Sequence, residues 1–350
     1  MEILETSALG SPTDAGYAMP AEWERHERCW MAWPDRADHW GEEHLAETQQ
    51  AFSKVARAIR AFEPLTMVAN AESAETARSL CGPEIDVVTI PIDDAWLRDS
   101  GPSFLRRADG AVAGVAWRFN AWGGKSRYGR DAQLAQAVLS RAGAPAYHAS
   151  LCLEGGGIHC DGEGTVITTE SVVLNPNRNP GITKADAEEE LCLALGANKV
   201  IWLPGDPEGL TGDITDGHID GLVAFVRPGV VLFESDPTAT GALRDLVEMN
   251  RAALESAKDA KGRALDIIPL DDAYEVESDE PHFACSYVNF YIANGGIVMP
   301  KFGVPGDERA RDVIAKAYPD RQVVQVDVTS IAPGGGGIHC ITQQQPATRA

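Results

Sequence analysis

The sequence Glu-Gly-Gly-Gly-Ile-His-Cys at residues 154–160 recurs near the end of the chain as Pro-Gly-Gly-Gly-Gly-Ile-His-Cys at residues 333–340. The six residues Gly-Gly-Gly-Ile-His-Cys are common to both copies, which lie 180 residues apart. An identity of this length that includes both His and Cys indicates internal duplication, and duplicated chains fold as arrays of similar modules. The two copies leave two candidate reactive thiols, Cys160 and Cys340.

The segments around these copies repeat the order strand, strand, helix, strand. Apolar spacing predicts helices over residues 45–62, 185–195 and 243–254 and a shorter one around 313–317. A β-rich run follows each helix, at residues 65–68, 199–203, 265–270 and 322–328. Since single strands do not alternate with helices and no Gly-x-Gly-x-x-Gly opens a helix, a Rossmann sheet is excluded. The pattern predicts an α/β fold of strand-rich modules around one central cavity.

The composition predicts one folded, acidic chain. Apolar residues make up 44% and charged residues 23% of the 350, which excludes a disordered or low-complexity protein. Because no linker-like stretch divides the sequence, we expect a single catalytic domain over residues 1–350. The net charge of −22 would repel phosphate backbones and anionic membrane surfaces and attract small cations, so we expect no nucleic-acid or membrane partner.

The cysteines and the N-terminal residues indicate the cellular compartment of the protein. The seven cysteines are scattered and contain no Cys-x-x-Cys pair, which argues against a disulfide framework and fits a reducing compartment. Residues 1–16 lack the basic and apolar parts of a signal peptide, and no apolar run reaches membrane-spanning length. We therefore expect a cytoplasmic protein, and the sequence leaves a homo-oligomer open.

Four segments place polar residues among glycines at expected strand ends: residues 93–102, 154–160, 215–221 and 333–340. His218 and Asp220 would lie on one face if residues 217–221 begin a strand. A carboxylate beside an imidazole can raise the pKa of the imidazole and orient the ring for proton transfer. This pair is therefore a candidate acid–base site.

Two further carboxylates stand close to glycines in these segments. In an extended segment Trp96 and Arg98 would share one face, and Asp99 would lie on the other. Glu154 follows the apolar residues 151–153, and a carboxylate at the end of a buried strand normally has a partner or a task. We therefore expect a specific partner for Glu154.

Together the four segments supply one or two thiols, an imidazole and three carboxylates. Three carboxylates around one cavity require a cation, and a guanidinium group suits them because it offers five donors in a fixed fork. A metal ion bound by His218, Asp220 and Glu154, as in an amidohydrolase, would also balance the charge, but tight ligand spacings such as His-x-x-x-His are absent from the sequence. We therefore expect a thiol mechanism without a metal or other cofactor.

With these motifs in view, the sequence resembles the agmatine deiminase family, the bacterial peptidylarginine deiminase-like branch of the guanidine-modifying enzymes with the pentein α/β-propeller fold. The resemblance spans nearly the whole chain and rests on Met19–Trp23, Cys29–Pro34, Trp96-x-Arg98-Asp99-x-Gly101-Pro102, Glu154–Gly157, Gly217-His218-x-Asp220 and Gly334–Cys340. It implies five ββαβ modules around a polar central channel. Asp216 and Gly221 stand where the family pattern has Asn, which leaves the tail of the substrate open.

The resemblance also implies the chemistry of the thiol and the imidazole. Cys340 would be the nucleophile and Cys160 its structural copy. His218 would serve as general acid and base together with Glu154. Hydrolysis would then pass through a covalent thiouronium on the cysteine and release ammonia.

Substrate binding is implied in the same way. Asp99, Asp220 and Glu154 would hold the guanidinium group, and Trp96 would pack against it. The implied substrate is agmatine and the product N-carbamoylputrescine, a step of polyamine biosynthesis that leads to putrescine. Deimination of arginine or of a peptide's C-terminal arginine is the alternative within the same chemistry, and a non-catalytic cation-binding propeller is the alternative outside it.

Overall fold

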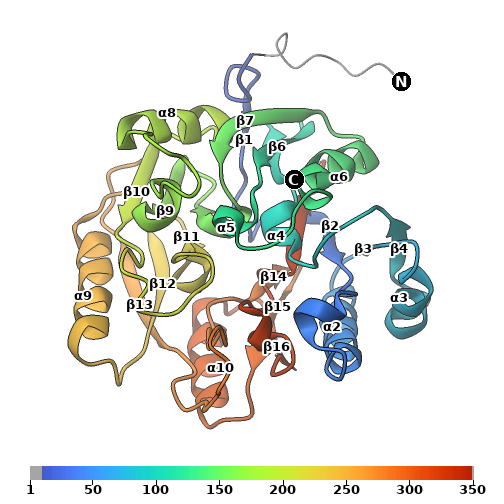
Figure 1. The fold of residues 1–350 in the computed structure, drawn as a ribbon. Helices are drawn as coiled ribbons and strands as arrows, with labels where there is room; N and C mark the ends of the chain where they lie inside the picture. The colour runs from blue at the N-terminus through green and yellow to red at the C-terminus, as the bar shows by residue number, and fades with distance from the viewer. Residues whose placement is uncertain (1–9, 349–350) are drawn as a thin grey trace.

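Five small sheets build the computed structural model, which describes residues 10–348. In each sheet the first two strands are antiparallel, and the third is parallel to the second and connected to it through a helix. Figure 1 shows the five units arranged around a common centre, with their long helices on the outside. The predicted α/β-propeller of five ββαβ modules is therefore confirmed. Residues 1–9, part of the segment in which no signal peptide was expected, lie outside the described residues.

The five modules follow one another along the chain, except that one edge strand of the first module's sheet comes from the C-terminal end. The first contains β17 (Thr342–Pro346), β2 (His26–Ala32), α2 (Leu45–Arg60) and β3 (Leu65–Ala69), extended by α1 (Ala37–Trp40), α3 (Ala74–Cys81) and β4 (Asp86–Thr89). The second contains β5 (Ser103–Arg107), β6 (Val112–Arg118), α6 (Leu134–Ala142) and β7 (Ala146–Cys152), with β1 (Tyr17–Ala18) at its edge.

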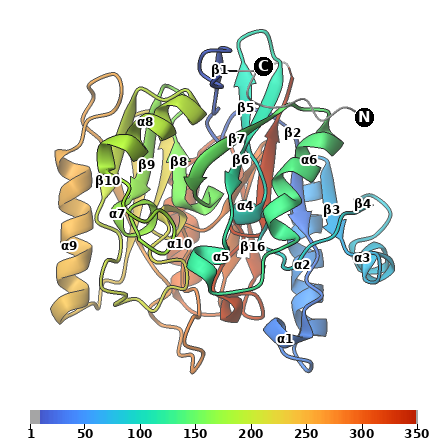
Figure 2. The ribbon, with the colours of Figure 1, turned by 45° about the horizontal axis from the view of Figure 1, so that its top comes forward.

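The other three modules match the predicted repeat. They contain β8 (Ile158–Cys160), β9 (Thr165–Thr169), α7 (Glu170–Val173), α8 (Lys184–Leu195) and β10 (Lys199–Leu203); β11 (Val223–Arg227), β12 (Val230–Ser235), α9 (Gly241–Ser256) and β13 (Asp266–Asp271); and β14 (Tyr291–Ala293), β15 (Gly296–Lys301), α10 (Gly306–Ala317) and β16 (Gln322–Asp327). Figure 2 shows α9 and α2 on opposite sides of the ring, with the strands between them.

The helices form where apolar spacing and caps predicted them. On α2 the side chains of Phe52, Val55 and Ile59 are fully buried against the sheets. At the start of α8 the Thr183 hydroxyl accepts a hydrogen bond from the Asp186 N–H at 3.1 Å, and the helix ends at Gly196 with a φ of 66°. A capping hydroxyl and a left-handed glycine are common ends of a helix, so local sequence determines these boundaries.

Pairing of β17 with β2 closes the ring. Thr342 pairs with Met31 and Gln345 with Arg28 in an antiparallel register. Because Cys340 lies two residues before β17, this closure carries the second copy of the duplicated string to the centre of the molecule. Within residues 10–348, no helix combines the length and apolar character needed to cross a membrane.

Candidate active site

Irregular turns, rather than strands, carry the predicted polar side chains. Asp99 lies on the short helix α4 (Leu97–Ser100), and Glu154 precedes the 3-10 turn η3 (Gly155–Gly157). Residues 219–221 form another such turn, η4, so the strand on which the sequence made the shared face of His218 and Asp220 conditional does not form. The elements α4, η3 and η4 contact one another, which brings these side chains into one buried cluster.

Gly156 marks the point on which the cluster converges. A β-carbon at this position would lie 2.7 Å from His218 Nδ1, 2.8 Å from Asp99 Oδ1 and 2.9 Å from Asp220 Oδ2. Only a glycine lets the three groups approach so closely, and its N–H donates to Asp99 Oδ1 at 3.0 Å. His218 Nδ1 is buried without a hydrogen-bond partner among the described residues. An unpaired buried polar atom facing two carboxylates indicates a place for a polar ligand.

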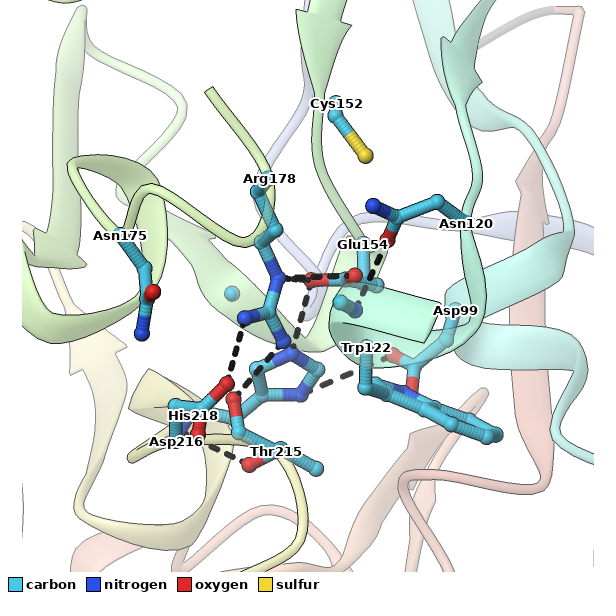
Figure 3. Close-up of polar contacts among 12 residues, drawn as sticks. Asp99, Asn120, Trp122, Cys152, Glu154, Asn175, Arg178, Thr215, Asp216 and His218 are labelled. Atoms are coloured by element: carbon cyan, nitrogen blue, oxygen red, sulfur yellow. Dashed lines mark hydrogen bonds and ion pairs between the residues drawn. The ribbon is translucent and has the colours of Figure 1, made fainter. Parts of the chain in front are cut away.

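Glu154 has the partner that its buried position required. Both of its carboxylate oxygens accept from Arg178 Nε, at 3.0 and 2.9 Å, and Oε2 lies 3.2 Å from His218 Nε2. Figure 3 shows Glu154 in contact with both the Arg178 guanidinium and the His218 ring. Burial alone would raise the pKa of Glu154, but His218 and Arg178 outweigh it and lower that pKa. Arg178 was not predicted, because its Asn-Pro-Asn-Arg-Asn-Pro surroundings resemble an ordinary loop.

His218 is protonated at neutral pH. Burial disfavours its imidazolium form, but Asp99, Glu154 and Asp220 overcome this and raise the pKa of His218 to about 9. Its Nδ1 lies 3.8 Å from Asp99 Oδ1 and 4.0 Å from Asp220 Oδ1. A charged ring in this position can donate a proton.

Asp99 is the carboxylate with no cation bonded to it. Its Oδ2 accepts from Trp122 Nε1 at 2.9 Å and its Oδ1 from the backbone of Gly156, so both donors are neutral. Burial, with Asp220 and Glu154 adding to it, raises the pKa of Asp99 to about 6. Trp122 has a φ of 57°, a strained conformation for a bulky residue, and this strain directs its indole to the site. Trp122 was not predicted, although the Trp-Gly-Gly run at 122–124 is the kind of signal that could have marked it.

Cys340 lies beside Asp220 and is held by an asparagine. Asn289 Nδ2 donates to the sulfur at 3.2 Å, and Asn289 Oδ1 accepts from the Cys340 N–H at 3.2 Å. Asp220 Oδ2 lies 3.6 Å from the sulfur. Burial, followed by Asp220 and Asp99, raises the pKa of the Cys340 thiol well above its ordinary value. The thiol is therefore protonated until a cation offsets these carboxylates.

The second copy of the thiol has other neighbours. Cys160 Sγ contacts the backbone oxygen of Pro20 at 3.9 Å, and burial together with Glu22 raises its pKa. Of the two duplicated cysteines, the structure thus places Cys340 next to Asp220, which sequence alone could not decide.

Trp96 and Arg98 point in different directions, so the prediction of a shared face was wrong. A β-carbon on Gly336 would lie 2.6 Å from Trp96 Cζ3 and 3.1 Å from the Cys340 sulfur, so the indole and the thiol flank this glycine. The guanidinium of Arg98 instead donates to the side chains of Gln343 and Gln344, each at 2.8 Å. The helical turn of α4 separates the two directions.

A cavity of about 400 Å³ opens from Cys340 and His218. Its lining includes Asp220, Glu234, Asp272 and residues of α9. Burial and Asp236 raise the pKa of Asp272 to about 7, and burial and Asp272 raise the pKa of Glu234 well above its ordinary value. Among the described residues, no Lys or Arg lines this cavity, so the lining offers no cation as a partner for a carboxylate.

One group of potential metal ligands occurs within residues 10–348: Glu22, His159 and His339, whose ligand atoms lie within 4.8 Å of one another. Arg98 Nη1 already lies 3.4 Å from Glu22 Oε1, and both ring nitrogens of His339 contact carboxylates. A cation at this point would meet the Arg98 charge, so these residues do not fit a metal site.

Comparison with known proteins agrees with this geometry. Residues 18–346 match the model of the Porphyromonas-type peptidyl-arginine deiminase family. The chain belongs to this family. It is 43% identical to an agmatine deiminase of Pseudomonas aeruginosa (98% of this chain, 99% of that protein) and 42% identical to one of Stutzerimonas stutzeri with the same coverage. A solved agmatine deiminase of Enterococcus faecalis superposes with a TM-score of 0.90 at 34% identity, covering 97% of this chain and 99% of the other.

Proposed function

We propose that the protein hydrolyses a guanidinium group to a ureido group and ammonia, with agmatine as the substrate. One observation carries the proposal: Asp99, Asp220 and the unpaired His218 Nδ1 surround a common point next to the sulfur of Cys340. A guanidinium there would donate to both carboxylates and present its carbon to the thiol. Arg178 already offsets the charge of Glu154. We therefore propose that Glu154 acts chiefly on His218 and that its contact with the substrate is secondary.

Binding of the cation would start the reaction. Two carboxylates keep the Cys340 thiol protonated in the free protein, and a bound guanidinium offsets their charge and lowers the pKa of the thiol. The thiol loses its proton to solvent, and the thiolate attacks the guanidinium carbon. Asn289 Nδ2, already a donor to the sulfur, would stabilise the thiolate before attack. Trp96, on the other side of Gly336, would limit how the substrate can sit.

His218 would serve both later steps. Its imidazolium gives a proton to one nitrogen of the tetrahedral adduct, the carbon–nitrogen bond breaks, and ammonia leaves a thiouronium on Cys340. The neutral ring then takes a proton from water as its oxygen attacks the same carbon. Collapse breaks the carbon–sulfur bond, the hydroxyl proton of the adduct passes to the departing sulfur, and the ureido product leaves the free Cys340 thiol. Glu154 at 3.2 Å from Nε2 orients the ring and stabilises its charged form throughout. The scheme uses no metal or other cofactor.

The lining of the cavity supports agmatine over arginine. Agmatine carries an ammonium group at the far end of its chain, and Glu234 and Asp272 are among the residues that line the cavity next to Cys340. Arginine would bring a carboxylate into the same acidic lining without a basic partner. The matched family's description favours peptidyl-arginine instead, so arginine at a peptide C-terminus is the second candidate substrate.

Ammonia release from equal concentrations of agmatine, arginine and a peptide with C-terminal arginine tests this assignment. We expect agmatine to have the highest kcat/KM, Cys340→Ser to abolish turnover, and Cys160→Ser, a change at an equally buried thiol, to retain it. Preference for arginine would contradict the proposed tail. Turnover that survives in Cys340→Ser would contradict the mechanism, and no turnover of any guanidine would favour the non-catalytic alternative.

The wider expectations fit the same proposal. We propose that residues 1–350 act as one catalytic unit, since the ring is complete only when β17 pairs with β2. All seven cysteines are free thiols, which supports a reducing, cytoplasmic setting. A homo-oligomer and the absence of nucleic-acid and membrane partners stay predictions from the sequence.

A further inference from the structure

A buried histidine connects the Asp220 carboxylate to a second carboxylate. His339 Nδ1 lies 2.8 Å from Asp220 Oδ2, and His339 Nε2 lies 2.9 Å from Glu22 Oε1. An imidazole with a carboxylate at each nitrogen satisfies both only when both nitrogens carry hydrogen, that is, as an imidazolium. The three residues are at most 4% exposed, so water does not substitute for these contacts.

Glu22 also contacts a second cation, the guanidinium of Arg98. Arg98 Nη1 lies 3.4 Å from Glu22 Oε1, and Arg98 Nε donates to the backbone oxygen of His339 at 3.3 Å. Burial would raise the pKa of Glu22, but His339, Arg98 and His159 hold it well below its ordinary range. The far edge of the His339 ring therefore faces a permanently charged and anchored carboxylate.

We propose that His339 is a positioning residue for the deimination: its imidazolium keeps Asp220 ionised and holds its Oδ2 next to the sulfur of Cys340. Oδ2 is the shared atom, at 2.8 Å from His339 Nδ1 and 3.6 Å from the sulfur. His339 acts through Asp220 and has no role of its own in bond making. The inference rests on the proposed function and adds to it the residue that sets the charge of Asp220, one of the two carboxylates proposed to hold the guanidinium group.

The charge of Asp220 depends on every ionisable group that faces this chain of contacts. On the substrate side these groups are His218, Asp99, Glu154 and Cys340, and on the other side His339, Glu22, His159 and Arg98. Burial raises the pKa of Asp220, and His339 is the strongest of the groups that lower it. Without the imidazolium, the pKa of Asp220 would rise, as burial already raises the pKa of Asp99 to about 6, and the pair would retain a proton to higher pH. A half-protonated pair would hold a guanidinium weakly.

Two substitutions separate the contacts of the ring. In His339→Asn the amide nitrogen lies close to the place of Nδ1, so the donor to Asp220 is kept while the contact with Glu22 is lost. In His339→Gln the amide nitrogen lies close to the place of Nε2, so the donor to Asp220 is lost. We expect kcat/KM for agmatine at neutral pH to fall about tenfold in the first variant and about a hundredfold in the second.

The pH profile distinguishes positioning from packing. We expect the acidic limb of kcat/KM to move to higher pH in both variants, and further in His339→Gln, because a neutral residue no longer opposes protonation of Asp220. His159→Gln is the matched control, since His159 is equally buried and stacks on His339 with ring centroids 6.2 Å apart but does not contact Asp220. Burial lowers the pKa of His159 to about 4, so the ring carries no charge near neutral pH that the substitution could remove. The acidic limb of kcat/KM for His159→Gln should lie at the same pH as that of the natural protein. Thermal unfolding of each variant verifies that it is folded.

Equal losses in both His339 variants at every pH, with an unmoved acidic limb, would overturn the inference and leave a packing role. If His339→Gln does not fold, Glu22→Gln replaces it, and its acidic limb should also move to higher pH because the imidazolium loses its anchor. The natural protein is assayed in parallel. If it turns over no guanidine, the proposed function falls and takes the inference with it, whereas normal turnover with an unmoved limb overturns the inference alone.

Discussion

Replacing Asp99 by Asn should impair catalysis without a matching loss of stability. The carboxylate is 3% exposed, and its two bonded donors, Trp122 Nε1 and the Gly156 N–H, carry no charge. Asn keeps the size of the side chain and one acceptor but turns an N–H toward one of these donors. The change removes the charge that a guanidinium would pair with, so kcat/KM for agmatine should fall by roughly a hundredfold or more.

The stability effect follows from the pKa of Asp99, which rises from an ordinary value of 3.8 to about 6 in the folded protein. A carboxyl whose pKa is raised by folding favours the folded state at low pH, and this contribution is lost as the pH rises from the ordinary value to the folded one. The difference corresponds to about 3 kcal/mol. At pH 8 the ionised Asp99 therefore destabilises the free protein by about that amount, and an uncharged Asn does not.

Urea unfolding of the natural protein and of Asp99→Asn at acidic and alkaline pH measures this contribution. For each protein we take the change in unfolding free energy between pH 4 and pH 8, because the cost of the misplaced amide is the same at both pH values and cancels. This change should be about 2–3 kcal/mol more favourable in the variant than in the natural protein. Exposed carboxyls titrate alike in both proteins. A relative stability that does not change with pH would refute the view that Asp99 is a strained, uncompensated charge, even if activity were lost.

Three shorter predictions concern the rest of the site. A cationic haloacetamidine should alkylate Cys340 much faster than neutral iodoacetamide, because only the cation offsets the carboxylates that, with burial, keep the thiol protonated. Equal alkylation rates, measured by mass spectrometry, would contradict this. Arg178→Gln should lower the unfolding free energy by about 3–5 kcal/mol because it removes the guanidinium that pairs with the buried Glu154 and with Asp216, whereas the partly exposed Arg263→Gln should cost less than about 1 kcal/mol in the same urea titration. Added salt should lower kcat/KM for agmatine while kcat stays constant, since the net charge of −22 accelerates encounter with a dication; a constant kcat/KM would exclude such steering.

Local sequence predicted the elements of the fold well, because helix ends and hairpins depend on nearby residues. The cap at Thr183 and the left-handed Gly196 are both contained in the segment they terminate. The closing pair of β2 and β17 joins opposite ends of the chain, and no local pattern contains that information. This pairing was therefore not predicted.

The turn before His218 shows why residues 217–221 do not form a strand. Thr215 Oγ1 accepts from the His218 N–H at 3.1 Å, and Asp213 Oδ2 accepts from the Gly217 N–H at 3.1 Å. Side chains that bond their own backbone a few residues away replace the hydrogen bonds of a sheet. Asp216, with a φ of 67°, completes the turn. Residue types singled out His218 and Asp220 as a candidate acid–base pair, but they did not contain the geometry of the turn that holds the two side chains.

Arg178, Asn289 and Trp122 were missed for a different reason. Arg178 and Asn289 reach the site from segments without a motif, and Trp122 reaches it from a Trp-Gly-Gly run that was not used. Each contacts a residue that the sequence did predict: Glu154, Cys340 and Asp99, respectively. Charge reasoning required a cation near Glu154, but it could not choose among the many arginines of the chain. Such partners are fixed by tertiary contacts alone.

The duplicated string explains how one site arises between two copies of the same sequence. Gly156 and Gly336 occupy equivalent positions, and each lacks the β-carbon that would block the site, one toward His218 and the other toward the sulfur of Cys340. At the position of Glu154 the second copy has Gly334, where a β-carbon would lie 2.6 Å from the Trp40 ring. A second glutamate therefore has no room, and the first copy alone supplies the carboxylate for His218. The copies have kept the glycines that make space and have divided the reacting groups between them.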